Sequence, residues 1–318
     1  CVSGGASLHV IHAIAETKGI EYVCPQHEQA AGFAADSYAR LTGLGCALAT
    51  SGPGATNLLT AVASSYYDSI PVIYLAGQTS QGKSSLGLNL AVDVAAQGHK
   101  VAMFSIEDSK ESIGLRALAA ESGVSLFRLR SGYLNDRDWA PLSAAFSRLG
   151  SCALWFDDSP RLSVQELRAK CRRVQSAHGL DLVVVDYVQL MYAPWRSENR
   201  TRELGMISSG LKQIAKELRV PLLALSQLNR DPMKENRRPR LSDLRESGNL
   251  EQDADLVWLI YRPEQQTPTA DNEGLAELIV AKQKNGPTGT VKLRFHKDTF
   301  RFVTWVDADR PAWREFVV

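Results

Sequence analysis

Cysteines are few in this sequence and follow no pattern. The 318 residues include five cysteines, scattered along the chain, and no two of them form a CxxC pair. Structural disulfides and zinc sites normally need paired or clustered thiols, and an odd, unclustered count is typical of a reducing compartment. We therefore expect the cysteines to be small core residues of a cytoplasmic protein.

Long hydrophobic runs and targeting signals are also missing. No run approaches the roughly 18 apolar residues that a membrane helix needs, so we expect no membrane partner. The first five residues carry no basic segment and no signal-peptide pattern, and they lack an initiator methionine. The sequence is accordingly expected to be a fragment or a trimmed chain.

A strong net charge is absent as well. The net charge is +1, and a composition with 44% hydrophobic and 22% charged residues is ordinary for a globular protein. The charge is uneven, because residues 1–76 carry two basic and five acidic residues, which leaves the remainder at +4. Six cations lie between Arg230 and Arg245. Bulk charge alone does not establish a nucleic-acid partner.

Most of the chain alternates apolar, strand-like runs with helical patterns, which is typical of a parallel sheet covered by helices. The predicted buried strands are Gly45–Thr50, Pro71–Ala76, Val101–Ile106, Ala153–Phe156, Leu182–Val185, Pro221–Ser226 and Leu256–Tyr261. The predicted helices are Glu28–Leu41, Ala55–Ser65, Lys83–Ala96, Lys110–Ser122, Ser163–Ala177 and Thr201–Leu218.

The last third changes character, and no internal repeat is present. Leu275–Lys282, Thr290–Phe295 and Phe300–Val306 are predicted as antiparallel strands, with a turn at 285–289. The loop Gln227–Arg240 is polar and basic and contains two prolines. It is the best candidate for a mobile functional loop.

A phosphate-binding pattern follows the second predicted strand. The run Gly77-Gln78-Thr79-Ser80-Gln81-Gly82-Lys83-Ser84 fits G-x-x-x-x-G-K-[ST]. An apolar strand precedes it and an amphipathic helix follows, so backbone amides and the helix N-terminus would face phosphate oxygens. Lys83 would reach the β- and γ-phosphates of ATP, and Ser84 would ligate Mg²⁺. The alternative is a chance glycine-rich turn. The predicted nucleotide-binding residues are Gly77, Gln78, Thr79, Ser80, Gln81, Gly82, Lys83, Ser84 and Ser85.

Polar residues at the ends of other strands complete the predicted site. Asp186 ends the strand Leu182–Val185 and would hold the magnesium shell together with Ser84. Glu107 ends another strand and is favoured as the carboxylate that orients the attacking water. Its neighbour Asp108 is interpreted as a helix cap. Gln227 would sense the γ-phosphate or simply form a hydrogen bond within its loop.

Six further motifs follow one another along the chain. They are Phe104-Ser105-Ile106-Glu107, Val184-Val185-Asp186-Tyr187-Val188-Gln189-Leu190-Met191, Ala224-Leu225-Ser226-Gln227-Leu228, Leu241-Ser242-Asp243-Leu244-Arg245-Glu246-Ser247-Gly248, Glu251-Gln252-Asp253-Ala254-Asp255 and Ala281-Lys282-Gln283-Lys284-Asn285-Gly286-Pro287-Thr288-Gly289. Taken in order, these motifs resemble the C-terminal motor domain of bacterial replicative helicases of the DnaB type. The resemblance covers residues 75–305.

This resemblance implies a RecA-like motor that uses ATP and Mg²⁺, works as a homo-oligomeric ring, usually a hexamer, and unwinds DNA as a 5′–3′ helicase. Lys282 and Lys284 match the basic pair that reaches the neighbouring subunit's γ-phosphate, although the second position is commonly arginine. Arg245, Glu246 and Gly248 match the loop that follows single-stranded DNA; a solvated charged face is the alternative. The family's amino-terminal domain and linker helix are missing, so we expect no processive helicase from this chain alone.

The amino-terminal part of the chain carries motifs of a different kind. They are Gln26-His27-Glu28-Gln29-Ala30-Ala31, Ala34-Ala35-Asp36-Ser37-Tyr38-Ala39-Arg40, Thr50-Ser51-Gly52-Pro53-Gly54-Ala55-Thr56-Asn57 and Tyr67-Asp68-Ser69-Ile70-Pro71-Val72. With these segments, residues 2–78 resemble a different family, the pyrimidine-binding domain of thiamine-diphosphate enzymes of the acetolactate-synthase type. In that family Glu28 would protonate the cofactor's aminopyrimidine ring. The G-D-G…N metal motif that thiamine diphosphate also needs does not occur, so Glu28 is expected to be a vestige.

Together these patterns predict an α/β fold in two parts. Residues 71–318 are expected to form a RecA-like P-loop NTPase core with a mainly parallel sheet and C-terminal antiparallel strands. Residues 1–70 are expected to form a truncated α/β lobe. The join is consistent with a recombined gene, an engineered chimera or a misassembled reading frame. Two alternatives to a DNA-stimulated motor ATPase stay open: a thiamine-diphosphate-dependent lyase or carboligase fragment, and an inactive helicase-binding module.

Overall fold

The computed structural model describes residues 72–78, 80–192, 200–229, 231–235, 237–284 and 286–305. Nearly all of them belong to one compact unit, Ile70–Val303. The predicted elements Glu28–Leu41, Gly45–Thr50 and Ala55–Ser65 lie outside the described residues, and the amino-terminal lobe therefore stays a prediction.

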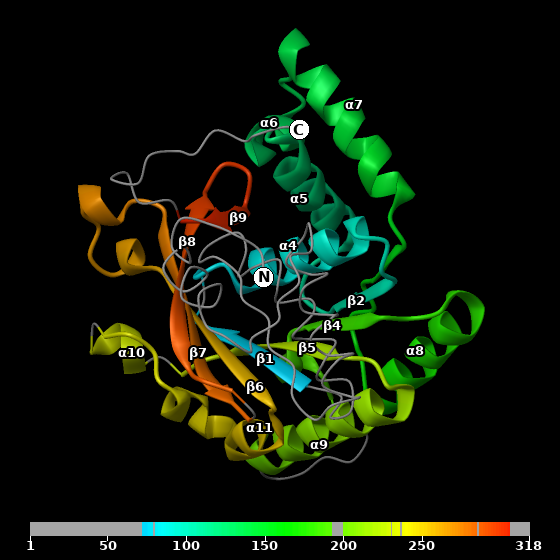
Figure 1. The fold of residues 1–318 in the computed structure, drawn as a ribbon, viewed down its shortest axis with the longest axis vertical. Coiled ribbons are helices and arrows are strands. Elements are labelled where there is room, and N and C mark those ends of the chain that lie inside the picture. The colour runs from blue at the N-terminus through cyan, green and yellow to red at the C-terminus, as the bar shows by residue number, and fades with distance from the viewer. Residues whose placement is uncertain are drawn as a thin grey trace, which may run out of the picture. The chain divides into compact units, whose positions relative to one another are not determined.

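Within the described part of the chain, one sheet of nine strands forms the centre of the fold (Figure 1). The strands are β1 Val72–Gly77, β2 Val101–Ser105, β3 Leu154–Asp157, β4 Leu182–Asp186, β5 Leu222–Gln227, β6 Leu256–Tyr261, β7 Leu275–Gln283, β8 Gly289–His296 and β9 Arg301–Thr304.

The sheet is parallel over its first part and antiparallel at its C-terminal side. The strand order is β3-β2-β4-β5-β1-β6-β7-β8-β9. β1 lies in the middle and pairs in parallel with β5 on one side and β6 on the other. β7 is antiparallel to both β6 and β8. The carboxyl ends of β1, β2, β4 and β5 consequently meet at one edge, the edge where ligands bind in open α/β sheets.

Helices connect the strands. The α-helices are α4 Lys83–Ala96, α5 Lys110–Ser122, α6 Leu126–Ser131, α7 Asp136–Ser151, α8 Val164–His178, α9 Arg200–Leu218, α10 Asp231–Lys234 and α11 Gly248–Asp253. The 3₁₀ helices are η3 Val188–Leu190, η4 Leu241–Ser247, η5 Pro263–Gln265 and η6 Ala270–Asn272.

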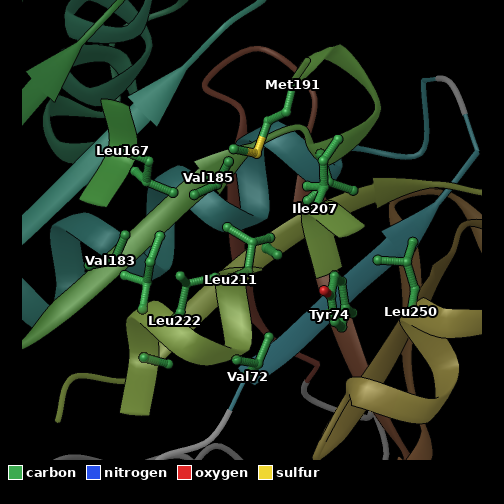
Figure 2. Packing of buried hydrophobic residues seen from close by; sticks show 14 of the residues in the cluster. Val72, Tyr74, Leu167, Val183, Val185, Met191, Ile207, Leu211, Leu222 and Leu250 are labelled. Carbon is green, nitrogen blue, oxygen red and sulfur yellow. The ribbon is translucent and has the colours of Figure 1, made fainter. Parts of the chain in front are cut away.

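Two hydrophobic clusters bury the two faces of the sheet. On one face α8, α9 and α11 pack over the parallel strands, and Figure 2 shows part of this cluster around Leu211 of α9. Tyr74 of β1 is fully buried there, and its hydroxyl lies 3.0 Å from the Ser208 hydroxyl of α9. On the other face α4 and α5 pack over the same strands, and Phe295 of β8 and Phe302 of β9 extend that cluster to the antiparallel strands.

The structure confirms the predicted α/β architecture, with ends shifted by a residue or two. The strand predicted at Ala153–Phe156 is Leu154–Asp157, and the one predicted at Phe300–Val306 is shorter, at Arg301–Thr304. Helix α7 was not predicted. It contains Pro141, and its Trp139 and Phe146 are exposed, so its apolar residues do not follow a single buried stripe.

Candidate active site

The predicted phosphate loop joins the end of β1 to the start of α4. Gly82 is the N-cap residue of α4 with φ +93°, and Ser80 is also left-handed with φ +66°. Glycine offers no capping side chain, so the first amide groups of α4 are left for another acceptor. Amides at a helix N-terminus, together with the helix dipole, attract phosphate. Thr79 lies outside the described residues.

The two motif glycines are required for different reasons. A Cβ atom at Gly77 would overlap the side chain of Ile260, so Gly77 allows β1 to pack closely against β6. A Cβ atom at Gly82 would lie 2.8 Å from Cζ of Phe302, in addition to the strain of its positive φ. The neighbouring strands therefore help to determine the shape of the loop.

Two glutamine side chains anchor the loop instead of facing outward. The Gln78 amide nitrogen donates to the Asn229 carbonyl oxygen at 3.3 Å, and both glutamines are buried. The Gln81 side-chain oxygen accepts a hydrogen bond from the Arg262 backbone amide at 2.5 Å. Ser85 is buried within α4. Any contact of Gln78 and Gln81 with a nucleotide would have to come from their backbone.

Lys83, Ser84 and Asp186 come together at the carboxyl edge of the sheet. The Lys83 ammonium points back into the loop and lies 3.4 Å from the Gln78 carbonyl oxygen. Burial lowers the pKa of Lys83, and the charges of Asp186 and Glu107 oppose this effect. The Ser84 hydroxyl is close enough to the Asp186 carboxylate to lower its pKa as a hydrogen-bond donor.

Asp186 is a buried acid with spare capacity to bind a ligand. Its exposure is 1%, and its Oδ1 atom has no hydrogen-bond partner in the described part of the chain. Burial raises the pKa of Asp186 to about 6, despite the opposing Ser84 hydrogen bond and the Lys83 charge. A cation beside Oδ1 would satisfy that oxygen and stabilise the charged form.

These residues fit magnesium bound together with a nucleotide. Among the described residues no group of three or more His, Cys, Asp and Glu side chains is placed to hold a metal ion. Mg²⁺ does not require such a group, because it usually keeps several waters and binds one or two protein oxygens plus substrate phosphates. Ser84 and Asp186 supply that smaller set.

Glu107 lies in the segment that follows β2, at the same edge. It is exposed, and its charge acts on both Lys83 and Asp186. The interpretation of Asp108 as a helix cap was wrong. Ser109 is the N-cap of α5 and accepts from the Ser112 amide at 3.3 Å, whereas Asp108 accepts a hydrogen bond from Arg116 at 2.6 Å.

Gln227 ends β5 directly beside the phosphate loop, because it pairs in register with Gly77. Its backbone is held by Gln189 of η3. The Gln189 oxygen accepts from the Gln227 amide at 3.1 Å, and the Gln189 nitrogen donates to the Gln227 carbonyl at 3.1 Å and to the Ser226 hydroxyl at 2.9 Å. Sequence reasoning missed this role of Gln189. The available signal was a polar residue inside the otherwise apolar segment Val188–Met191.

Lys282 and Lys284 do not join this cluster. β7 runs antiparallel to β6, and Lys282 pairs with Val257, which pairs in turn with Tyr74 of β1. Tyr74 is three residues before the end of β1, so both lysines lie toward the amino edge of the sheet, away from the chain's own phosphate loop.

Both lysines contact neighbouring elements. The Lys282 ammonium donates to the Glu251 carbonyl oxygen at 2.6 Å, near the end of α11. The Lys284 ammonium is exposed and lies 3.8 Å from the buried Asp255 carboxylate. Both lysines are therefore engaged within the chain at this edge of the sheet.

The predicted DNA-binding residues lie at the junction of η4 and α11. Arg245 and Glu246 are in η4, and Gly248 begins α11; the side chains of 245–249 are outside the described set. The junction is anchored on both sides by the buried side chains of Leu244 and Leu250.

The basic segment before this junction is held in place by ion pairs. Arg237 donates to both carboxylate oxygens of Asp243 at 2.8 Å. Arg238 donates to both oxygens of the buried Glu277 at 2.7 Å. The loop Gln227–Arg240 thus includes the short helix α10. At least two of its arginines form ion pairs, so part of its positive charge is neutralised within the chain.

The fold and the site define a P-loop domain of the RecA-like class. The chain belongs to the family of the DnaB-like helicase C-terminal domain, whose sequence profile matches residues 65–304. It is 43% identical over 235 residues to the replicative DNA helicase DnaB of Geobacillus stearothermophilus and to the replicative DNA helicase DnaC of Bacillus subtilis. These matches cover 73% of this chain and 52% of each relative, so the chain spans about half the length of the curated relatives that it matches.

Solved structures agree with this assignment. One of them, described as an ATPase domain, superposes with a TM-score of 0.71 at 31% identity, covering 74% of this chain and 85% of that one. A DnaB-like replicative helicase, whose structure was described with its interactions with primase, gives the same score and identity, with 58% of that chain covered.

A second family profile, that of the thiamine pyrophosphate enzyme N-terminal TPP binding domain, matches residues 1–103. The two profiles overlap at residues 65–103, which include the phosphate loop. None of the helices in the described residues is both long and apolar enough to cross a membrane.

Proposed function

We propose that residues 71–318 form a magnesium-dependent motor ATPase of the replicative DNA helicase type, stimulated by single-stranded DNA. One observation carries the proposal. The left-handed loop ending at Gly82 brings Lys83 and Ser84 to Asp186, whose Oδ1 is buried without a partner among the described residues. A triphosphate with its cation is the ligand that would satisfy the free amides, the ammonium and the carboxylate together.

The residues of the loop would bind and orient ATP. The α4 amides and Lys83 would hold the β- and γ-phosphates, and Ser84 and Asp186 would hold Mg²⁺. When bound, Mg²⁺ neutralises charge on the phosphate oxygens. Glu107 would orient the attacking water and accept its proton, since it is exposed and its charge acts on both Lys83 and Asp186. Gln227, fixed by Gln189, would report the state of the γ-phosphate to the strands beside it.

A ring of identical chains is the assembly that this proposal favours. Lys282 and Lys284 lie at the opposite edge of the sheet from their own phosphate loop, which is where a pair acting on a neighbour's nucleotide belongs. Single-stranded DNA would follow Arg245, Glu246 and Gly248, and action on DNA would place the protein in the cytoplasm.

The test is ATP turnover by the purified protein with and without Mg²⁺ and single-stranded DNA. We expect turnover that depends on Mg²⁺ and rises with DNA, and its loss in Lys83→Ala. The matched control is Lys216→Ala, which removes an exposed lysine from α9 on the other face of the sheet. Normal turnover in Lys83→Ala, or equal loss in both variants, would refute the proposed site.

DNA contact is tested separately by its salt dependence. Neutralisation of DNA phosphates releases counterions, so affinity should fall steeply as salt rises. Arg245→Ala should weaken binding to all sequences alike and reduce the slope of log K against log salt by about 1. Binding that does not respond to salt would remove this loop from the proposal.

The profile match at residues 1–103 favours one second candidate, a thiamine-diphosphate-dependent lyase or carboligase. It predicts cofactor binding that Glu28→Ala abolishes, and calorimetry without detectable binding of thiamine diphosphate would exclude it. A non-catalytic helicase-binding module is the remaining alternative. An inactive protein that still co-purifies with helicase subunits would favour it.

A further inference from the structure

Arg262 lies outside every predicted motif, yet it contacts two consecutive residues of the phosphate loop. It follows β6 and is 4% exposed. Its guanidinium donates to the Ser80 carbonyl oxygen at 3.1 Å, and its backbone amide donates to the Gln81 side chain at 2.5 Å. About 180 residues of sequence separate the partners, so these contacts exist only in the folded domain.

The Arg262 side chain is itself fixed on all sides. It forms a buried ion pair with Glu264, and its guanidinium lies over the Phe295 ring, 4.1 Å from the centroid. Glu264 also accepts from the Gly274 amide at 2.8 Å and lies 3.1 Å from the Lys297 ammonium. Burial alone would raise the pKa of Glu264, but these hydrogen bonds hold it below the ordinary value. The Arg262–Glu264 ion pair is thus buried and charged, and neighbouring groups hold both of its side chains in place.

The contact with Ser80 determines which way a loop amide points. In a trans peptide unit the carbonyl and the next N–H point in opposite directions. Holding the Ser80 oxygen against Arg262 therefore turns the Gln81 amide to the inner side of the loop, where it donates a hydrogen bond to the Gln78 carbonyl oxygen at 3.4 Å. The Lys83 ammonium points at that same oxygen from 3.4 Å. Both donors thus meet at one carbonyl oxygen, and a phosphate oxygen would replace that acceptor.

The contact also offsets strain. Ser80 has φ +66°, a left-handed conformation that costs a residue with a side chain roughly 1–2 kcal/mol. Loops with such strain persist only where their surroundings hold them. We infer that Arg262, held by Glu264, is a positioning residue that keeps the phosphate loop in its nucleotide-receiving shape. This inference rests on the proposed function.

The experiment measures the affinity of the full chain for a fluorescent ATP analogue with Mg²⁺. Arg262→Ala should weaken binding about tenfold, the usual scale for residues that orient a binding group. Arg262→Lys should recover only part of the lost affinity. Lysine keeps the positive charge, but one ammonium cannot bind both Glu264 and the Ser80 carbonyl oxygen. The control is Arg238→Ala, which breaks an ion pair with the buried Glu277 through an exposed arginine, whose described side-chain hydrogen bonds go to that carboxylate and not to the phosphate loop.

Melting temperatures of all variants separate positioning from general stability. The inference predicts weaker ATP binding in Arg262→Ala than in Arg238→Ala when both are measured well below their own melting temperatures. If Arg262→Ala does not fold, Arg262→Lys and Arg262→Gln carry the same comparison. Affinity within twofold of wild type in the Arg262 variants, or an equal loss in Arg238→Ala, would overturn the inference.

Lys83→Ala is measured alongside to keep the two hypotheses apart. If Lys83→Ala loses binding and the Arg262 variants keep it, the positioning role fails and the nucleotide site stands. If Lys83→Ala binds as tightly as wild type, the loop is not the nucleotide site and both ideas fail.

Discussion

Asp186 shows the conflict between stability and function at the scale of one residue. Its carboxylate is buried, and burial disfavours the charged form. Without a metal, Asp186→Asn should therefore raise the free energy of unfolding at pH 8, by an amount on the order of 1–3 kcal/mol. The same variant should lose magnesium-dependent ATP turnover.

Thermal unfolding without magnesium, together with a turnover assay, checks this prediction. Ser84→Ala is the comparison, because it removes a hydrogen bond to Asp186 and leaves the charge. A less stable Asp186→Asn protein would mean that the carboxylate is satisfied within the fold and is not kept for a cation.

Asp243 shows the opposite case, a buried acid whose charge is stabilised. Burial alone would raise the pKa of Asp243, but hydrogen bonds from Arg237 and the Arg240 amide hold it below the ordinary value. A carboxyl whose pKa is depressed on folding adds stability above its unfolded pKa and loses it as pH falls through the folded pKa. Asp243→Asn should thus cost about 1–3 kcal/mol at pH 7 and progressively less as the pH falls below about 4.

Denaturant unfolding at several pH values measures this difference. We expect the difference in the free energy of unfolding between wild type and Asp243→Asn to stay constant near neutral pH and to become smaller only in acid. A gap that is constant with pH would show that the loss comes from packing and not from the charge.

Some site residues are readable from the sequence and others are not. Lys83 and Asp186 stand in local patterns, a glycine-rich turn before a helix and an acid after an apolar strand, so their chemistry follows from their neighbours. Arg262 carries no such pattern, and its role depends on Ser80 and Gln81, which only the fold brings near it. The interpretation of Asp108 failed for a local reason, because Ser109 competes with it for the cap position.

At the scale of elements, the turn between β1 and α4 depends on packing from β9. Gly82→Ala would add strain at positive φ and place Cβ 2.8 Å from Cζ of Phe302. We expect a loss of about 1–3 kcal/mol in stability and weaker ATP binding. The matched control is Gly98→Ala, since Gly98 also has positive φ, at +89°, but a Cβ there meets nothing within 4 Å among the described residues.

Unfolding and nucleotide binding of the two glycine variants separate strain from collision. Gly98→Ala should show only the strain and keep wild-type affinity for ATP. Adding Phe302→Leu to Gly82→Ala should recover part of the loss. Equal effects of both glycine variants would mean that β9 does not shape the loop.

The elements were easier to predict than their arrangement. Apolar runs such as Leu182–Val185 identify buried parallel strands, and the glycine-rich turn after Leu275–Lys282 indicates a change to antiparallel pairing. The central place of β1, between β5 and β6, could not be read from the sequence, because it results from pairing between segments far apart in the chain. Helix α7 was missed because it keeps large aromatic side chains in solvent.

At the scale of the whole molecule, the positions of Glu107 and Lys284 predict complementation between chains. Under the proposed function, Glu107 would act in the chain's own nucleotide site and Lys284 in a neighbour's site. Glu107→Gln and Lys284→Ala proteins should each lose turnover, by about 10²-fold or more for Glu107→Gln. In a ring assembled from equal amounts of the two variants, roughly a quarter of the interfaces would place a chain that keeps Glu107 next to a chain that keeps Lys284.

Mixing the two variants in equal amounts and measuring ATP turnover tests this arrangement. Recovery of activity above that of either variant alone supports sites shared between chains. A mixture of Glu107→Gln with Lys83→Ala is the control, because both changes fall in the same site and should not complement. Activity of Lys284→Ala alone at the wild-type level would remove the lysine from catalysis.

The central claim is that the turn ending at Gly82 and Lys83 is the nucleotide site of this chain. Calorimetric titration of the purified protein with ATP and Mg²⁺, compared with Lys83→Ala and the control Lys216→Ala, tests it most directly. We expect the wild type and Lys216→Ala to bind ATP, Lys83→Ala to show no binding, and binding to be much weaker without Mg²⁺. Unchanged binding of ATP by Lys83→Ala would contradict it.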